Sequence, residues 1–182
     1  LIHRCSRRCF VDIVWHPSNE FFTFSDSDAF WLFNLSASEP ERLLTNEVDD
    51  EGRSTNVFGG GSWAKNGRHL LLWAGATEGS SRLVFDVPTG ELTGIPNSFI
   101  YVDPFRTSVT WMQDDRLLVI RGFEADQPRI ELARFNHEAE QKLVVEESQL
   151  LSDEAGLIVS SGIHLENGRF GYLLTHPTDS SQ

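Results

Sequence analysis

The side chains of this chain that could do chemistry belong to six histidines, two cysteines and 27 acidic residues. A histidine serves as the general base of a Ser-His-Asp hydrolase when the serine stands in a sharp Gly-x-Ser-x-Gly turn. Neither that turn nor the Ser-x-Asp-x-Gly box of sialidases occurs in the sequence. Two carboxylates can also cleave a glycosidic bond, but no spacing here singles out a pair. The sequence therefore predicts no catalytic residue and no enzyme.

Two acidic loops carry the kind of oxygen ligands that calcium prefers: Asp26 with Asp28, and the run at 49–52. A calcium loop also needs further spaced ligands and a bidentate glutamate, which both loops lack. The glycine run at 59–62 lacks the Gly-Lys-Ser/Thr and the following helix of a phosphate-binding loop. We expect solvated acids, a glycine-rich start to a crowded inner strand, and neither a metal nor a cofactor.

Both cysteines, Cys5 and Cys9, stand in the basic segment of residues 1–10. In a strand their Cα atoms would lie about 13 Å apart, too far for a disulfide, and no second pair completes a metal site. We expect free thiols, which leave the redox compartment open. The segment itself is expected to be a solvated extension, with a juxtamembrane remnant or a DNA-contacting arm as the alternatives.

The balance of charge and hydrophobicity excludes two classes of partner. A formal net charge of −12 opposes nucleic-acid binding, which needs clustered Lys and Arg to neutralise phosphates. No apolar stretch approaches the eighteen or so residues of a membrane span. Because the sequence begins at Leu1 and its one methionine is Met112, we expect a processed product, an excised domain or an incomplete gene product.

An internal repeat is the strongest signal in the sequence. Trp15, Trp63 and Trp111 are evenly spaced, about 48 residues apart, which is the size of a structural repeat. Each is followed by a polar turn and then a short apolar run. A fourth copy has His164 in place of the tryptophan, after a slightly longer interval. The structural explanation for the tryptophans is packing between neighbouring units rather than ligand binding.

Alternation and β-branched or aromatic residues predict several short strands in each unit. The expected strands are 11–15, 21–24 and 29–35; then 57–63, 69–73, 82–87 and 91–95; then 108–111, 117–121, 129–135 and 142–145; and finally a run ending near 164 and another at 170–174. Polar loops are expected at 25–28, 75–81 and 122–128. Only residues 137–151 compete as a helix, and the run Leu143-Val144-Val145 favours a strand there.

Four short antiparallel strands at a period near 48 are typical of a propeller blade. The predicted fold is all-β, a β-propeller segment of about three and a half four-stranded blades. Their expected limits are 11–48, 57–99, 105–148 and, for the half blade, 157–182. An open array leaves apolar faces and a strand edge in water. We therefore expect a protein partner, further blades or a second copy to cover them; in a homodimer, residues 1–10 would donate a strand.

The second unit resembles the TolB-type repeat, a relative of the WD-repeat blade. The resemblance rests on Ser62-Trp63-Ala64-Lys65-Asn66-Gly67-Arg68-His69-Leu70 and on Leu83-Val84-Phe85-Asp86-Val87-Pro88-Thr89-Gly90-Glu91. The other units match more loosely, with Asn34 and Arg134 where the second has Asp86. Such repeats are similar to those of periplasmic TolB proteins and of the sensory domains of membrane-bound winged-helix regulators. They also look like the propeller that caps the active site of prolyl-oligopeptidase-type serine peptidases.

These settings imply a non-enzymatic interaction or sensory domain, extracytoplasmic, that binds a protein or small ligand through loops at the blade ends. The alternative is the propeller of a serine peptidase whose catalytic domain lies outside this sequence. His16 and His164 are the residues expected near the ends of a central channel, where they line it or serve as ordinary turn residues.

Overall fold

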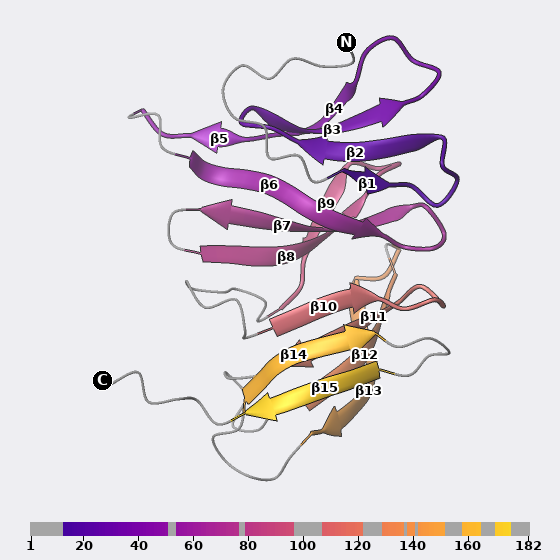
Figure 1. Ribbon diagram of the computed structural model, residues 1–182, viewed down its shortest axis with the longest axis vertical. Coiled ribbons are helices and arrows are strands. Elements are labelled where there is room, and N and C mark those ends of the chain that lie inside the picture. Colours follow the sequence, from indigo (N-terminus) through magenta and orange to yellow (C-terminus); the bar gives the residue numbers. More distant parts are fainter. Residues whose placement is uncertain are drawn as a thin grey trace. The chain divides into compact units, whose positions relative to one another are not determined.

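The computed structural model describes residues 13–50, 54–76, 79–96, 107–121, 129–136, 138–140, 142–151, 158–164 and 170–175. These residues form fifteen strands and no helix. They divide into two compact units, Leu1–Ile95 and Pro96–Gln182, which are drawn in indigo to magenta and in rose to yellow in Figure 1. Within the described part of the chain, no helix is long and apolar enough to cross a membrane.

The first sheet is an antiparallel meander of β1 (Val14–Trp15), β2 (Phe21–Ser25), β3 (Ala29–Asn34) and β4 (Glu41–Thr45), in chain order. Its central strands are almost wholly apolar, because both faces of the sheet are covered. Phe22, Phe24 and Phe33 form a cluster on one face. Phe30 and Leu32, on the other face, join the cluster shared with the second sheet.

The second sheet contains β5 (Glu47–Val48), β6 (Ser54–Trp63), β7 (His69–Ala76), β8 (Gly79–Asp86) and β9 (Glu91–Gly94), paired in that order. The short β5 was not expected, and it makes this sheet five-stranded. β7 and β8 also extend further than expected, and they pair as far as Ala76 with Gly79. Residues 75–81 were predicted to be a polar loop, but small residues can continue an antiparallel ladder when backbone bonds are available.

The second unit opens with a four-stranded sheet of β10 (Thr107–Trp111), β11 (Arg116–Arg121), β12 (Arg129–Phe135) and β13 (Leu143–Leu150). β13 settles the competition between helix and strand at 137–151 in favour of the strand. A further pair follows, β14 (Ile158–His164) and β15 (Phe170–Thr175). The all-β architecture and the four-stranded antiparallel sheets confirm the predicted fold class (Figure 1).

The sequence repeat appears in the structure as a repeated register. Each repeated position is the last residue of a strand. Trp15 ends β1, Trp63 ends β6, Trp111 ends β10 and His164 ends β14. Each stands opposite the first or second residue of the next strand, in the pairs Trp15↔Phe22, Trp63↔Leu70, Trp111↔Leu117 and His164↔Phe170. A turn of similar length therefore follows each repeated position, and the alignment of the four units carries over to the strands.

The main hydrophobic core of the first unit lies between its two sheets. Buried Phe30 from the first sheet and Phe58, Leu70, Leu72 and Phe85 from the second belong to one cluster. Leu44 of β4 and Leu83 of β8 pack against it. A smaller cluster of Leu118, Ile120 and Ile130 lies in the second unit. Apolar burial of this kind is the main favourable term in folding.

Candidate functional site at the turn end of the first two sheets

Three turns lie at one end of the first two sheets. In an antiparallel meander alternate connections share an end, so the β6–β7 turn at 64–68 and the β8–β9 turn at 87–90 lie at the same end of the second sheet. A contact between His16 and Gly67 brings the β1–β2 turn at 16–20 beside them. These turns present their polar side chains to solvent. The exposed residues are Pro17, Ser18, Asn19, Glu20, Lys65, Asn66, Pro88, Thr89 and Gly90.

His16 joins the first of these turns to the second. Its Nε2 lies 2.9 Å from the Gly67 carbonyl oxygen, although the two residues are far apart in the sequence. Its Nδ1 accepts a hydrogen bond from the Ser18 backbone N–H at 3.0 Å. In this geometry Nε2 can donate to the Gly67 carbonyl while Nδ1 accepts from the Ser18 backbone. Both ring nitrogens therefore hold the turns in place.

Aromatic rings hold the same imidazole. The ring of Phe21 stacks on it with centroids 3.8 Å apart, and Trp63 approaches edge-on at 4.7 Å. Phe21 and Trp63 also meet edge to face at 5.9 Å. Such pairs add to area burial because the ring edges are positive and the faces negative. A channel lining was one expectation for His16; the structure places it as a linker between two sheets.

Gly67 is required at its position for two reasons. Its φ of +69° lies in the left-handed region, which side chains with a Cβ adopt at a cost. A Cβ there would also collide with the imidazole of His16. The turn can therefore approach the first sheet closely only because position 67 carries no side chain.

Asp86 is the buried acid of this end. Its carboxylate accepts two hydrogen bonds from Arg68, 3.1 Å from Nε and 2.8 Å from Nη2. The Asp86 carbonyl accepts from the Gly90 N–H at 2.8 Å, which closes the Thr-Gly turn. The side chain of Asp86 is 1% exposed and that of Arg68 is 35% exposed, so the bidentate pair spans from core to surface. The sequence marked Asp86, but only the structure shows its pairing with Arg68.

Asn46 links the two sheets at the opposite end. Its side-chain amide donates to the Asp26 carbonyl at 3.0 Å, and its side-chain oxygen accepts from the Phe58 N–H at 3.0 Å. A buried amide satisfied in this way fixes the separation of two strands. Sequence reasoning missed Asn46, because an Asn between two predicted strands is an ordinary loop residue.

In the first acidic loop, the Asp26 side chain stabilises the turn between β2 and β3. Its carboxylate accepts from the backbone N–H of Asp28 at 2.8 Å and of Ala29 at 2.9 Å. Asp26 is buried, so the expectation of a solvated acid was wrong there; Asp28 is exposed. Small acids commonly bond the backbone two or three residues on, which closes such turns. Within the part of the chain that the structure describes, no three His, Cys, Asp or Glu side chains could hold a metal ion.

The indole of Trp73 packs closely against the glycine run. A Cβ at Gly59 would lie 2.7 Å from Trp73 Cζ2, and one at Gly75 would lie 2.9 Å from Cζ3. Gly60 adopts φ +62° where the β6–β7 register shifts. This bulge and the missing side chains let the indole lie against the backbone. Arg82 stands opposite Trp73, and burial lowers the pKa of its guanidinium.

The other repeat positions differ in exposure. Trp63 and Trp111 are buried, whereas Trp15 is 50% exposed and meets Phe22 of its own sheet, ring centroids 5.1 Å apart. Trp63 shows the expected packing between neighbouring sheets, because its ring meets those of His16 and Phe21. His164 ends β14, and its side chain lies outside the described residues, as do Cys5 and Cys9.

The third sheet replaces the buried acid by an exposed ion network. Arg134, in the place of Asp86, stands directly opposite Arg116. Like charges opposite each other destabilise a sheet, but acids surround this pair. Glu146 accepts from Arg134 at 2.7 Å, and Asp114 and Glu147 accept from Arg116 at 2.7 and 3.3 Å. Desolvation works to raise the pKa of the Asp114 carboxyl, but the hydrogen bonds and charge of Arg116 outweigh it and lower the pKa.

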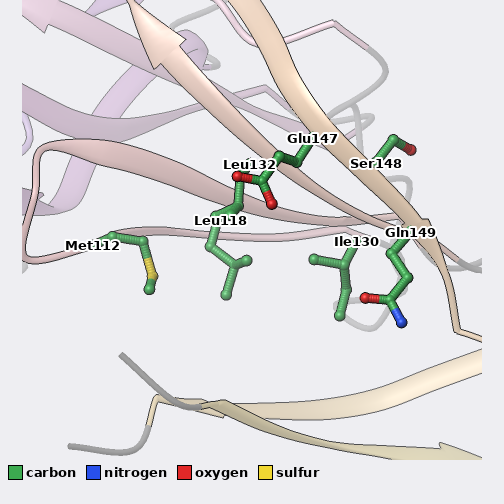
Figure 2. Close-up of a pocket in the computed structure, with 7 residues that line it drawn as sticks. All are labelled: Met112, Leu118, Ile130, Leu132, Glu147, Ser148 and Gln149. Carbon is green, nitrogen blue, oxygen red and sulfur yellow. The ribbon is translucent and has the colours of Figure 1, made fainter. Parts of the chain in front are cut away.

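One face of this sheet opens into a cavity of about 500 Å³ (Figure 2). Its lining residues are Met112, Leu118, Ile130, Leu132, Glu147, Ser148 and Gln149. Cavities of this size with an apolar floor and a few polar groups at the rim are typical of binding sites. The cavity was not predicted, since periodicity does not reveal where a sheet face stays uncovered.

Comparison with known proteins places this architecture. No protein-family model and no curated protein matches the chain. Among solved structures it resembles TolB from Acinetobacter baumannii at 14% identity and a TM-score of 0.51, over 90% of this chain and 40% of that one. It also resembles prolyl oligopeptidase B from Galerina marginata at 10% identity and a TM-score of 0.61, over 96% and 26%. The Dos1 propeller matches at 16% identity and a TM-score of 0.53, over 91% and 44%.

The chain therefore folds as part of a β-propeller. Its sheets are similar to those of TolB, as the repeat motifs predicted. It spans less than half the length of each of these three neighbours. At such identities the likeness concerns the fold, which supports many unrelated functions.

Proposed function

We propose that this chain is a non-catalytic binding part of a β-propeller protein, and that it recognises a protein or small ligand through the turn end of the first two sheets. The observation that carries the proposal is that the two ring nitrogens of His16 contact two different turns. Its ring nitrogens are engaged by Ser18 and Gly67, so the ring positions two exposed turns. Exposed polar turns on a rigid frame are a common form of recognition surface.

Site-specific photo-crosslinking tests this proposal in cells that make the full-length protein. A photoreactive residue at Asn19 or Asn66, both exposed on these turns, should capture one discrete species. Glu41, exposed on the outer strand β4, is the matched control and should capture none. Equal capture from all three positions, or capture from Glu41 alone, would refute the turn end as the recognition surface.

A second candidate is the propeller of a prolyl-oligopeptidase-type peptidase. It is favoured by the likeness to prolyl oligopeptidase B, which has the highest TM-score of the three neighbours described and covers 96% of this chain. In that setting the propeller gates access to a catalytic domain and carries no catalytic residue. The full-length protein should then cleave a fluorogenic proline-containing peptide, and a serine-directed inhibitor should abolish the cleavage. Absence of both would remove this candidate.

The proposed location is outside the cytoplasm, as the TolB resemblance implies. The low cysteine content agrees with it, because free thiols are at risk in oxidising compartments. An alkaline phosphatase fusion to the full-length protein should be active only if the propeller is exported. An inactive fusion, with an active cytoplasmic reporter at the same position, would contradict this location.

A further inference from the structure

The β1–β2, β6–β7 and β10–β11 turns, which follow the three repeated tryptophans, share one hydrogen-bonding pattern. In each turn one residue has a left-handed φ, and its backbone N–H donates to the carbonyl oxygen three residues earlier. These pairs are Asn19 to His16 at 2.9 Å, Gly67 to Ala64 at 3.0 Å and Asp115 to Met112 at 3.1 Å, with φ of +60°, +69° and +63°. The preceding side chain accepts from the backbone N–H two residues on: Ser18 from Glu20 at 3.3 Å, Asn66 from Arg68 at 2.8 Å and Asp114 from Arg116 at 3.3 Å. Each turn therefore uses a side-chain oxygen at this position, as Ser, Asn and Asp turns commonly do.

Among these three acceptors only Asn66 is an amide, and a glycine follows it. In an Asn-Gly dipeptide the glycine nitrogen can attack the carbonyl carbon of the Asn side chain, because the glycine has no Cβ to shield it. The new N–Cγ bond closes a succinimide ring, and the side-chain nitrogen leaves as ammonia with the proton that the backbone nitrogen gives up. Water then opens one of the two ring carbonyls. The product is aspartate or, with one extra methylene in the backbone, isoaspartate.

In the folded chain both reacting groups of Asn66 and Gly67 are held by hydrogen bonds. The Gly67 nitrogen donates to the Ala64 carbonyl at 3.0 Å, and the Asn66 side-chain oxygen accepts from the Arg68 N–H at 2.8 Å. The Asn66 side-chain nitrogen lies 3.4 Å from Nδ1 of His69. Ring closure breaks the first two bonds, because the backbone nitrogen gives up its proton and the side-chain carbonyl turns towards it. The reaction therefore requires local opening of the turn.

His16 restrains this turn from the first sheet. Its Nε2 lies 2.9 Å from the Gly67 carbonyl oxygen, and its ring occupies the place where a Gly67 side chain would be. The ring itself is held by Phe21, stacked on it at 3.8 Å, and by Trp63, edge-on at 4.7 Å. Opening of the turn has to move the Gly67 peptide away from this ring. The contact between the two sheets therefore opposes a reaction to which Asn66, as an exposed residue, is accessible.

We propose that Asn66 is a deamidation site, with water as the co-reactant, which the contact between His16 and Gly67 keeps inactive in the folded chain. When that contact opens, Asn66 converts to aspartate or isoaspartate. Aspartate preserves the turn, because Asp114 has the same place in the third sheet and accepts from the Arg116 N–H. Isoaspartate lengthens the backbone just before Gly67 and separates its carbonyl from His16. This inference does not depend on ligand recognition at the turn end.

A second copy of the same tripeptide provides an internal reference for the chemistry. Asn66-Gly67-Arg68 recurs in the sequence as residues 167–169. Chymotrypsin, which cleaves after aromatic residues and leucine, should release peptides 64–70 and 166–170, and mass spectrometry measures the exchange of the amide for an acid in each. In concentrated urea both peptides should deamidate at nearly equal rates. In the folded chain Asn66 should react at least about tenfold more slowly than it does in urea. Equal rates at Asn66 in the two conditions would overturn the proposal.

Variants separate the contact of His16 from the overall stability of the first unit. His16→Ala should speed deamidation of Asn66 in the folded chain at least about tenfold, because the ring that restrains the turn is gone. Asn46→Ala is the matched control, since it weakens the same unit at its opposite end and should produce a smaller acceleration. If His16→Ala loses its circular dichroism signal, Phe21→Leu replaces it, because it removes the stacked ring and keeps the imidazole. Acceleration no greater than that of Asn46→Ala would show that general unfolding controls the reaction, against the proposal.

The two products are distinguished by hydrogen exchange at residues 64–68. Asn66→Asp, made by mutation, should keep the protection of the wild type, because aspartate serves in the equivalent turn of the third sheet. Chains aged until they carry isoaspartate at position 66, identified with a methyltransferase specific for isoaspartyl residues, should lose that protection. Full protection in the isoaspartyl chain would overturn the predicted loss of the His16 contact. Loss of protection in Asn66→Asp would overturn the equivalence of positions 66 and 114.

Discussion

At the scale of single residues, the contact between His16 and Gly67 holds the turn end together. The imidazole is fixed by two hydrogen bonds and two aromatic rings, and Gly67 leaves room for it. The repeat motif places Gly67 in a turn, and the structure shows its left-handed φ. No local sequence pattern predicts that a histidine from another sheet occupies the space beside Gly67.

Replacing Gly67 by alanine should therefore cost more than its backbone angle explains. We expect Gly67→Ala to lower the free energy of unfolding by about 3 kcal/mol, from left-handed strain and the collision with His16. Gly90 is the matched control, because it has φ +72° and a Cβ added there would meet no atom within 4 Å. Gly90→Ala should cost only about 1 kcal/mol. Urea denaturation measures both, and equal losses would contradict the role of His16.

Asp86 makes the second contact of this kind. Removing one partner of a buried pair leaves the other uncompensated, and the partial exposure of Arg68 reduces the loss. We expect Asp86→Asn to destabilise the chain by about 2 kcal/mol in denaturant unfolding. Glu20→Gln, at an exposed turn position, should change stability by less than about 0.5 kcal/mol. A loss for Asp86→Asn no larger than that of the control would show the pair to be dispensable.

At the scale of elements, the strands follow from alternation and turn chemistry, whereas their lengths depend on what they pair with. β7 and β8 continue into the region of residues 74–81, which looks like a loop because its residues are small and polar. The bulge of β6 also depends on tertiary contacts, because Gly59, Gly60 and Gly75 lie close to the Trp73 indole. The sequence shows both the glycines and Trp73, but no local pattern indicates that the glycines lie against this indole.

A side chain at Gly59 should displace Trp73, because its Cβ would lie 2.7 Å from the indole. We expect Gly59→Ala to lower the free energy of unfolding by about 2 kcal/mol and to change the near-ultraviolet circular dichroism spectrum. Gly94→Ala is the control on edge strand β9, where the nearest atom, Leu83 Cδ2, lies 3.9 Å away. It should leave the spectrum unchanged. If the Gly59→Ala spectrum matches that of the wild type, the close packing of Trp73 against Gly59 is wrong.

The ion network of the third sheet should give a pH-dependent contribution to stability. The pKa of Asp114 is lower in the folded chain than in the unfolded one, so folding is favoured above the unfolded pKa, and that gain disappears as the pH falls through the folded pKa. Asp114→Asn should therefore be less stable than the wild type near neutral pH and equally stable in strong acid. Half-molar salt should shrink the difference, because the side chain of Asp114 is exposed to solvent. A difference that persists in acid would contradict this origin.

At the scale of the whole molecule, the chain consists of two compact units, each with its own hydrophobic cluster. The first unit is also joined by polar contacts at both ends, through His16 at one and Asn46 at the other. Propeller sheets contact mainly their neighbours, so stability in such arrays is a sum of local terms. Damage to one interface should therefore remain local.

Asn46→Ala tests this locality. The substitution removes two side-chain hydrogen bonds and leaves a buried N–H and a buried carbonyl with one partner fewer. We expect it to cost about 2 kcal/mol of stability. Hydrogen exchange monitored by mass spectrometry should accelerate across residues 13–95 and stay unchanged in residues 107–151. Equal acceleration in both units would show that they unfold together.

The amino-acid sequence by itself determined the repeat, the strand order and the all-β class. Pairing of a strand with the next one along the chain needs only a short turn, and a turn of similar length follows Trp15, Trp63 and Trp111. The tertiary structure decided which sheet faces meet and where one remains open. The His16 contact and the cavity beside Ile130 depend on side chains from elements that are distant in the sequence, and no local periodicity encodes their approach.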